Sequence, residues 1–217
     1  MPEKVNFKTA DGINIAASHW RGKEGSPAVL LLHMMPATKE SWNEFAQKLN
    51  QAGFGVLAID LRGHGQSEGG PDGWRSFSDS QHQKSIEDAR VGFQFQKDEG
   101  HSKFFLAGAS IGANLALQFL AESDETSAAV LLSPGLNYRG IETLEPAVKI
   151  RPNQGVFFAA AGDDRVIGAD SMARKLYDAA NCKKDIKIFE KGGHGTDLFA
   201  AHPELMPEII DWFKKFL

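Results

Sequence analysis

The chain has 217 residues, a length that fits one domain with a single substantial core. Apolar residues make up 42% of the sequence and charged residues 24%, as in ordinary globular proteins. The formal charge of −4, without any run of lysine and arginine, argues against a nucleic-acid partner. We therefore predict one globular domain covering residues 1–217.

The cysteine count and the N-terminal segment indicate a cellular location. Cys182 is the only cysteine, so no internal disulfide can form. The first residues, Met1 to Phe7, lack an apolar segment of signal-peptide length. No apolar run approaches the ~18 residues that a membrane-spanning helix requires. We expect a cytoplasmic protein without a membrane span.

Two types of strand are predicted in chain order. Residues 5–9 and 13–20 alternate polar and apolar side chains around Asp11 and Gly12, which favour a hairpin turn. Later runs are almost continuously apolar, as in central parallel strands that are covered on both faces. These runs are residues 28–32, 54–59, 104–107, 129–132 and 156–160, and residues 186–189 form a more exposed last strand.

Helical spacing separates these strands. We predict helices over residues 85–95, 111–120, 171–180 and 203–217, and another that begins at Ser41. Ser41 and Glu44 have the spacing of a capping box. In the last helix the apolar residues form one stripe, which we interpret as core packing: Leu205, Ile209, Trp212, Phe213 and Phe216. The pattern predicts an α/β fold whose functional residues lie at the C-terminal ends of the strands.

The strongest chemical motif surrounds Ser110. Residues 108–112 read Gly-Ala-Ser-Ile-Gly and lie directly between a predicted strand and a predicted helix. A G-x-S-x-G sequence in this context exposes the serine hydroxyl on a sharp turn. The alternative interpretation is that Ser110 only caps the helix.

A nucleophilic serine needs a base that accepts its proton. Among seven histidines, His194 lies in a glycine-rich loop, residues 191–195, between the last strand and the last helix. Glycines there would let the loop bring the imidazole over the edge of the sheet. We interpret four other histidines as solvated: His19, His82, His101 and His202.

The histidine in turn needs a carboxylate that fixes its tautomer. Asp163 and Asp164 both follow the predicted strand at residues 156–160. A carboxylate at the end of a strand could also serve only to cap the following turn. The residues alone leave both aspartates as candidates for the acid.

Together these motifs resemble the α/β-hydrolase superfamily over almost the whole chain. Residues 60–67 are similar to its D-x-R-G-x-G-x-S segment, and residues 7–12 resemble the opening of its monoglyceride-lipase and serine-aminopeptidase-like branches. The order Ser110, Asp164, His194 is the order of the triad in this fold. The resemblance implies that Asp164 is the acid and that His64, within the glycine-rich turn, is structural.

The resemblance also implies an oxyanion hole. The family usually has His-Gly-x after its third strand, but this chain has His33, Met34 and Met35 there. By position, the backbone N–H groups of Met35 and Ile111 are the expected donors, and His33 is the structural histidine. Met34 replaces the usual glycine, and the two methionines could shape an apolar acyl pocket.

The implied activity is hydrolysis of carboxylic esters, without a metal or organic cofactor. Only about twenty residues separate the strands at 129–132 and 156–160, too few for the helical cap of lipase-like relatives, so we expect an open site for small esters. The loops expected to line it carry Trp74, Phe77, Leu136 and Tyr138, for which core packing is an equal alternative. The alternative functions are hydrolysis of thioesters or amides and a receptor role without turnover. A thioesterase that acts on acylated protein would have a protein partner.

Overall fold

The computed structural model describes residues 1–166 and 168–217, and its centre is one eight-stranded sheet. The order across the sheet is β1-β2-β4-β3-β5-β6-β9-β10. These strands are β1 (Glu3–Lys8), β2 (Asn14–Trp20), β3 (Pro27–Leu32), β4 (Gly55–Ile59), β5 (Lys103–Ala109), β6 (Thr126–Leu132), β9 (Gly155–Ala161) and β10 (Lys183–Phe189). A separate two-stranded sheet pairs β7 (Asn137–Tyr138) with β8 (Ile141–Glu142).

The pairing of the strands confirms the predicted fold class. β1 and β2 form an antiparallel hairpin, and β2 also pairs antiparallel with β4. All pairs from β4 to β10 are parallel. The interior strands are buried on both faces, which explains their continuous apolar sequences.

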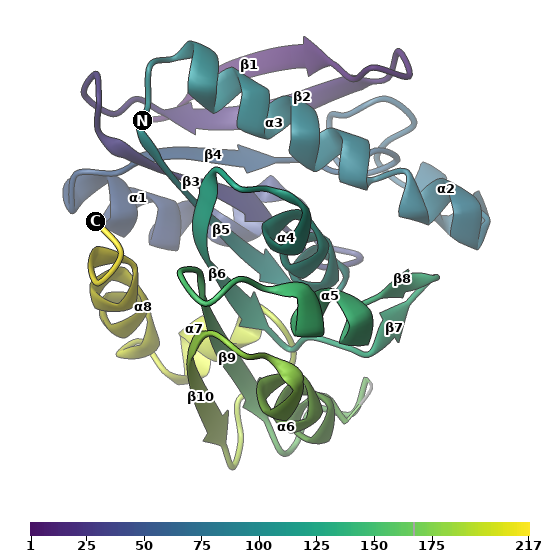
Figure 1. The fold of residues 1–217 in the computed structure, drawn as a ribbon. Helices are drawn as coiled ribbons and strands as arrows, with labels where there is room; N and C mark the ends of the chain where they lie inside the picture. The colour runs from purple at the N-terminus through teal and green to yellow at the C-terminus, as the bar shows by residue number, and fades with distance from the viewer. Residues whose placement is uncertain (167) are drawn as a thin grey trace.

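Helices cover both faces of this sheet. The helices are α1 (Asn43–Gln51), α2 (Asp79–Gln83), α3 (Ile86–Asp98), α4 (Ile111–Glu122), α5 (Leu144–Lys149), α6 (Ala169–Ala179), α7 (Asp197–Ala201) and α8 (Leu205–Lys214), with short 3₁₀ turns η1 (Lys39–Trp42) and η2 (Gly73–Ser76). Figure 1 shows α3, α4, α5 and α6 over one face and α1, α7 and α8 behind the other. The sheet therefore separates two hydrophobic cores.

The second core confirms the interpretation of the last predicted helix. The five apolar residues of its stripe are all buried, four of them in α8 itself and Phe216 just after it. Phe213 packs against Phe54 and Phe105, with ring centroids 6.3 and 4.9 Å apart. Burial of such aromatic side chains contributes about 1.5–3 kcal/mol each to stability. No helix within residues 1–166 and 168–217 has the length and apolarity to cross a membrane.

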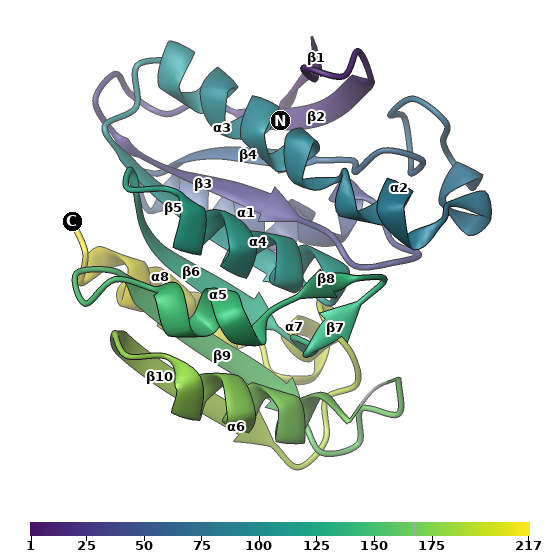
Figure 2. The same cartoon turned by 45° about the vertical axis from the view of Figure 1, so that its right-hand side comes forward.

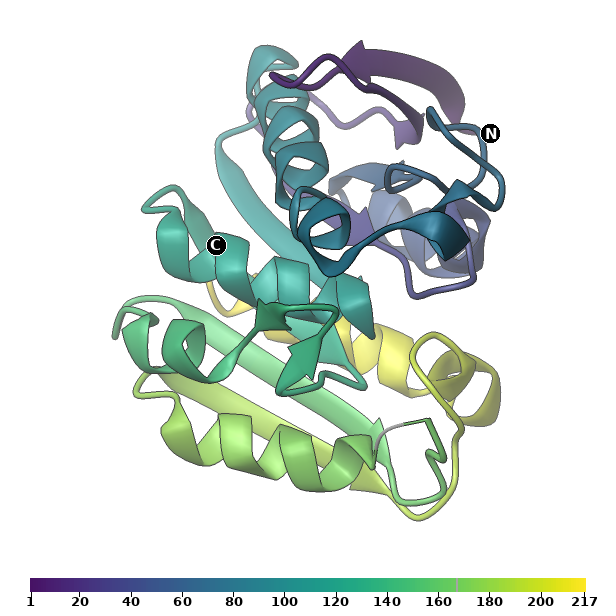
Figure 3. The same ribbon diagram turned by 90° about the vertical axis from the view of Figure 1, so that its right-hand side faces the viewer.

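The connection between β6 and β9 contains no cap domain. Residues 133–154 form only the β7–β8 hairpin and α5. The hairpin projects beyond the end of α4 in Figure 2, and in Figure 3 it lies near the middle of the end of the molecule that faces the viewer. The connection in which relatives carry a cap therefore holds only two short strands and one short helix.

The predicted capping box at Ser41 is wrong. Ser41 lies inside η1, where its hydroxyl donates to the Thr38 carbonyl at 2.9 Å, and α1 begins only at Asn43. A tight 3₁₀ turn precedes the α-helix, so the side chain satisfies a carbonyl instead of capping an amide. The capping box that does occur joins Ser78 and Gln81 at α2.

Candidate active site

Ser110 occupies the sharp turn between β5 and α4. Its φ of 54° and ψ of −119° lie in a region that non-glycine residues rarely adopt, and the residue as a whole is only 4% exposed. Its amide donates to the Leu132 carbonyl at the end of β6, and its carbonyl accepts the amides of Ala113 and Asn114. The strained backbone is thus held by the neighbouring strand and by the first turn of α4.

The glycines that flank Ser110 allow segments of backbone to pass close together. A methyl group on Gly108 would lie 2.1 Å from the Gly112 carbonyl oxygen. A methyl group on Gly112 would lie 2.3 Å from the carbonyl oxygen of Leu32, the last residue of β3. Both contacts are with backbone, so any larger residue would force the turn open.

His194 and Asp164 form a buried pair. The two atoms His194 Nδ1 and Asp164 Oδ2 are 2.7 Å apart, and the carboxylate side chain is 0% exposed. Because a carboxylate accepts only, Nδ1 carries the proton and Nε2 is free to accept one. Burial acts to raise the pKa of Asp164, but hydrogen bonds from His194, the Val166 amide and Ser133 together lower it. Asp164 is therefore ionised at neutral pH.

Asp163 has a different role in the same turn. Its Oδ1 accepts the amides of Gly192 and Gly193 at 2.9 and 3.0 Å, so it holds the loop that carries His194. The structure brings His194 to Asp164 and leaves Asp163 on the backbone of that loop.

Ser133, which the sequence motifs do not single out, links the acid to the histidine loop. It is fully buried at the end of β6, and its φ of 49° is unusual for serine. Its hydroxyl accepts the Gly195 amide at 2.9 Å and hydrogen-bonds to Asp164, which contributes to the low pKa of that carboxyl group. Its position at the C-terminal end of a parallel strand is the one signal in the sequence that could have indicated it.

Gly195 places the histidine loop against the Ser110 turn. A methyl group on Gly195 would lie 2.5 Å from Met34 Sδ and 3.3 Å from the Ala109 side chain. Gly195 also has a positive φ of 58°. Residues directly beside His194 and Ser110 are thus in contact, and the segment after β3 packs on both.

The two expected oxyanion donors lie on the segments that meet at this point. Ile111 is the first residue of α4, and the first amides of a helix have no partner within it. Met35 follows β3, and its side chain packs against the core beside α4. His33 is buried, and its Nε2 accepts the Leu61 amide while Nδ1 donates to the Met34 carbonyl, each at 2.9 Å. Burial lowers the pKa of His33 to about 4, so it is a neutral, structural residue.

A buried ion pair fixes the far end of this segment. Asp60 is 0% exposed in its side chain and accepts both the Lys39 ammonium at 2.6 Å and the Lys39 amide at 2.8 Å. Burial acts to lower the pKa of Lys39, but its bond to Asp60 raises it, so the ammonium stays charged. The loop between β3 and η1 is therefore tied at one end to β3 and at the other to the end of β4.

Lys39→Met is expected to lower the free energy of unfolding by about 3–5 kcal/mol, because it leaves the Asp60 carboxylate buried without its cation. Urea unfolding with an unchanged m value measures this loss. Lys48→Met is the control, since Lys48 forms only an exposed pair with Glu44 and should lose under about 0.5 kcal/mol. Equal losses for the two variants would refute the special role of the buried pair.

The interpretation of four histidines as solvated is wrong for three of them. His19, His82 and His101 are 2%, 2% and 8% exposed, and His202 is half-buried against Phe189. Burial lowers the pKa of His19 and of His82, so both are neutral. A neutral imidazole is cheaper to bury than a charged side chain, and sequence periodicity does not distinguish the two environments.

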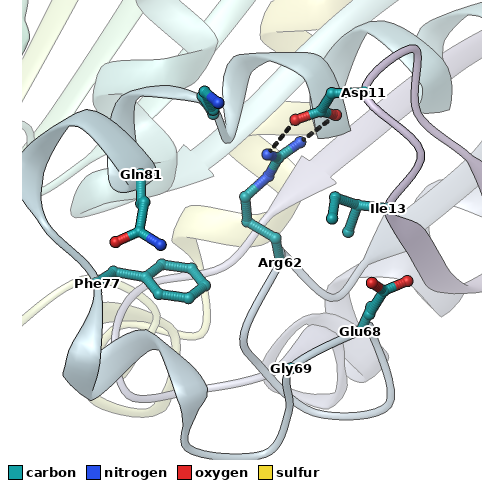
Figure 4. Close-up of a pocket in the computed structure, with 8 residues that line it drawn as sticks. Asp11, Ile13, Arg62, Glu68, Gly69, Phe77 and Gln81 are labelled. Atoms are coloured by element: carbon teal, nitrogen blue, oxygen red, sulfur yellow. Dashed lines mark hydrogen bonds and ion pairs between the residues drawn. The ribbon is translucent and has the colours of Figure 1, made fainter.

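The aromatic residues expected near the site divide between two places. Trp74 stacks on the ring of His64, whose Nδ1 donates to the Arg62 carbonyl, which supports a structural role for His64. Phe77 lines a surface pocket of about 360 Å³, whose lining includes none of the three candidate catalytic residues. Figure 4 shows Arg62 in this pocket, paired with Asp11.

Tyr138 lies near Ser110, and Leu136 packs on the same side of the sheet. Both are half-buried against the core on the α4 side of the sheet, and Tyr138 belongs to the β7–β8 hairpin. Burial raises the pKa of the Tyr138 hydroxyl, and a contact with Ser110 offsets this only in part. The structure thus places one of the four predicted lining residues directly beside the serine.

Comparisons of the sequence identify its relatives. Residues 24–150, more than half of the chain, match the family described as serine aminopeptidase, S33. A serine hydrolase-like protein of Dictyostelium discoideum is 30% identical over 52% of this chain, and a thiohydrolase of Aspergillus aculeatus is 35% identical over 31%. The matched regions span only 30% and 22% of those two proteins.

Solved structures extend the similarity of fold to the whole chain. An esterase of Pyrococcus furiosus aligns with a TM-score of 0.79 at 19% identity, covering 100% of this chain and 91% of its own. Est1E of Butyrivibrio proteoclasticus, solved with ferulic acid, aligns with a TM-score of 0.78 at 17% identity, covering 97% of each chain. These structures share the fold of the chain, and the family match shows that the chain belongs to the serine aminopeptidase S33 family of α/β-hydrolases.

Proposed function

We propose that the protein hydrolyses small carboxylic esters through an acyl-enzyme on Ser110. The observation that supports this most is the strained Ser110 turn together with the 2.7 Å contact between His194 and Asp164. An imidazole whose Nδ1 proton is held by a carboxylate presents a basic Nε2. In a hydrolase family, this arrangement fits nucleophilic catalysis by serine.

The proposed reaction has two halves. His194 Nε2 takes the Ser110 proton as the oxygen attacks the ester carbonyl, and the amides of Met35 and Ile111 bind the oxyanion. The C–O bond to the alcohol breaks, and His194 gives its proton to the leaving alkoxide. Water then attacks the acyl-enzyme, His194 accepts its proton, and Ser110 recovers that proton as the acid leaves.

The size of the substrate follows from the surroundings of Ser110. The serine is 4% exposed, and the half-buried Tyr138 of the short β7–β8 hairpin reaches its side chain. A hairpin of this size in place of a cap domain offers little apolar surface to enclose a long acyl chain. We propose short, water-soluble esters as substrates, in line with the esterase names of the structural neighbours.

The value of kcat/KM is expected to be highest for p-nitrophenyl acetate or butyrate. It should fall by about tenfold or more for octanoate and further for palmitate, because a longer chain must displace side chains packed around Ser110, and such overpacking costs about 1–3 kcal/mol. Initial rates across the series at a fixed pH measure this dependence. Absence of turnover on every ester would overturn the proposal. Equal kcat/KM values for all four esters, from acetate to palmitate, would overturn the proposed size limit.

Thioesters are the second candidate substrates, because one sequence relative is named a thiohydrolase. The same triad would serve, with a thiolate as the leaving group in place of an alkoxide. Butyryl thioester and butyrate ester, compared at equal chain length, distinguish the two candidates by kcat/KM.

A further inference from the structure

The β7–β8 hairpin is fixed to the helix that follows Ser110. The Asn114 side chain, fully buried in α4, donates to the Ile141 carbonyl at 2.8 Å and accepts the Gly135 amide at 3.0 Å. One turn further along α4, Gln118 donates to the Glu142 carbonyl at 2.9 Å. The hairpin therefore moves with α4 and holds a defined position relative to the Ser110 turn.

Tyr138 lies on the first strand of this hairpin, and its ring packs over Gly135. A methyl group on Gly135 would lie 2.7 Å from the ring, so glycine is required for this contact. In the strand pairing Tyr138 stands opposite the buried Ile141. The phenol is thus positioned by the pairing of its strand and by its contact with Gly135.

The hydroxyl of Tyr138 is enclosed and forms no complete hydrogen bond with any of the residues 1–166 and 168–217. It reaches the side chain of Ser110, and it also experiences the charge of Asp164. Buried tyrosine hydroxyls ordinarily have a partner, and leaving one unpaired costs about as much as a lost hydrogen bond. An enclosed hydroxyl that reaches Ser110 without completing a hydrogen bond can complete one with a group bound there.

Building on the proposed esterase function, we propose that Tyr138 is a catalytic residue whose hydroxyl donates a hydrogen bond to the reacting ester group bound at Ser110. The pKa of the hydroxyl is raised by burial, so it keeps its proton at neutral pH and can donate it in a hydrogen bond. No proton is transferred: the bond forms with the substrate and strengthens as charge develops on its oxygen.

Tyr138→Phe tests this role because it removes only the hydroxyl. The expected result is a fall of about 10- to 100-fold in kcat for p-nitrophenyl butyrate with KM within about threefold, since the donor acts mainly in the transition state. Tyr177→Phe is the matched control, because Tyr177 is the second of two tyrosines and is also half-buried. It lies on α6, where its ring packs on Phe158 of β9. The kinetics and the unfolding midpoint of Tyr177→Phe should equal those of the wild type. The unfolding midpoint of Tyr138→Phe should be no lower than that of the wild type, because the change removes a buried hydroxyl without a complete hydrogen bond.

A second measurement does not depend on the folding or activity of the Tyr138→Phe variant. Incorporation of 3-fluorotyrosine into Tyr177→Phe protein labels position 138 alone. Covalent reaction of Ser110 with a fluorophosphonate is expected to shift the ¹⁹F resonance of that label, because the phosphonyl oxygens occupy the place of the substrate. An unchanged resonance would contradict the proposal.

The outcomes separate the two proposals. Wild-type protein that neither reacts with the fluorophosphonate nor hydrolyses any ester would refute the proposed function itself. Wild-type activity that Tyr138→Phe retains to at least half would refute only the role of Tyr138.

Discussion

Replacement of Ser110 by alanine is expected to lower kcat for p-nitrophenyl butyrate on the order of 10⁶-fold, to the level of catalysis by the remaining groups. Without the hydroxyl oxygen no acyl-enzyme can form, so the oxyanion donors and His194 have no nucleophile to assist. Reaction with a fluorophosphonate should vanish as well, because the bond from phosphorus to the serine oxygen cannot be made.

Two controls accompany this variant. Ser102→Ala removes an exposed serine at the opposite end of β5, which only donates to the Gly25 carbonyl, and should leave kcat and labelling unchanged. The unfolding midpoint of Ser110→Ala should stay close to that of the wild type, because alanine bears the same backbone strain at a φ of 54°. Labelling or ester hydrolysis that persists in Ser110→Ala would place the nucleophile elsewhere.

Asp164→Asn is expected to lower kcat by about 10⁴-fold, with a much smaller effect on KM. The amide would present a donor as well as an acceptor to His194 Nδ1, so the imidazole could adopt the tautomer with its proton on Nε2. That tautomer cannot accept the Ser110 proton. Steady-state kinetics on p-nitrophenyl butyrate measure the loss.

Asp163→Asn is the matched control in the same turn. Asp163 accepts two backbone amides through Oδ1, and an asparagine oxygen can still accept both. We expect a loss in kcat below about tenfold, through a looser His194 loop rather than through a wrong tautomer. A larger loss for Asp163→Asn than for Asp164→Asn would reverse the assignment of the acid.

The sequence predicted the sheet well because the signals for its strands are local. Continuous apolar runs such as residues 28–32 and 156–160 lie within β3 and β9, and the Asp11-Gly12 turn lies between β1 and β2. The β7–β8 hairpin was not predicted, because strands of two residues carry no periodicity. Its turn instead depends on positive φ at Arg139 and Gly140.

The site was predictable only where a motif names its residues. Ser110 and His194 stand out by their flanking glycines, and chain order favoured Asp164 as the third candidate. Lys39, Ser133 and the contact of Tyr138 with Ser110 depend on partners that lie far apart in the sequence. Ser133 approaches Gly195, 62 positions later, and Lys39 approaches Asp60, 21 positions later. Such pairings follow from the packed fold, which single-sequence patterns do not contain.

The placement of α8 has a consequence for the protein during its synthesis. In this helix Phe213 packs on Phe105 of β5, and Trp212 packs on Phe157 of β9. The other helices on this face, α1 and α7, do not provide these two contacts. The part of this face around Phe105 and Phe157 therefore stays uncovered on the ribosome until α8 emerges. Exposed aromatic surface on an incomplete sheet promotes aggregation. The nascent chain thus depends on its last helix to bury the second core, and translation that stops before residue 205 would release an aggregation-prone intermediate in place of an enzyme.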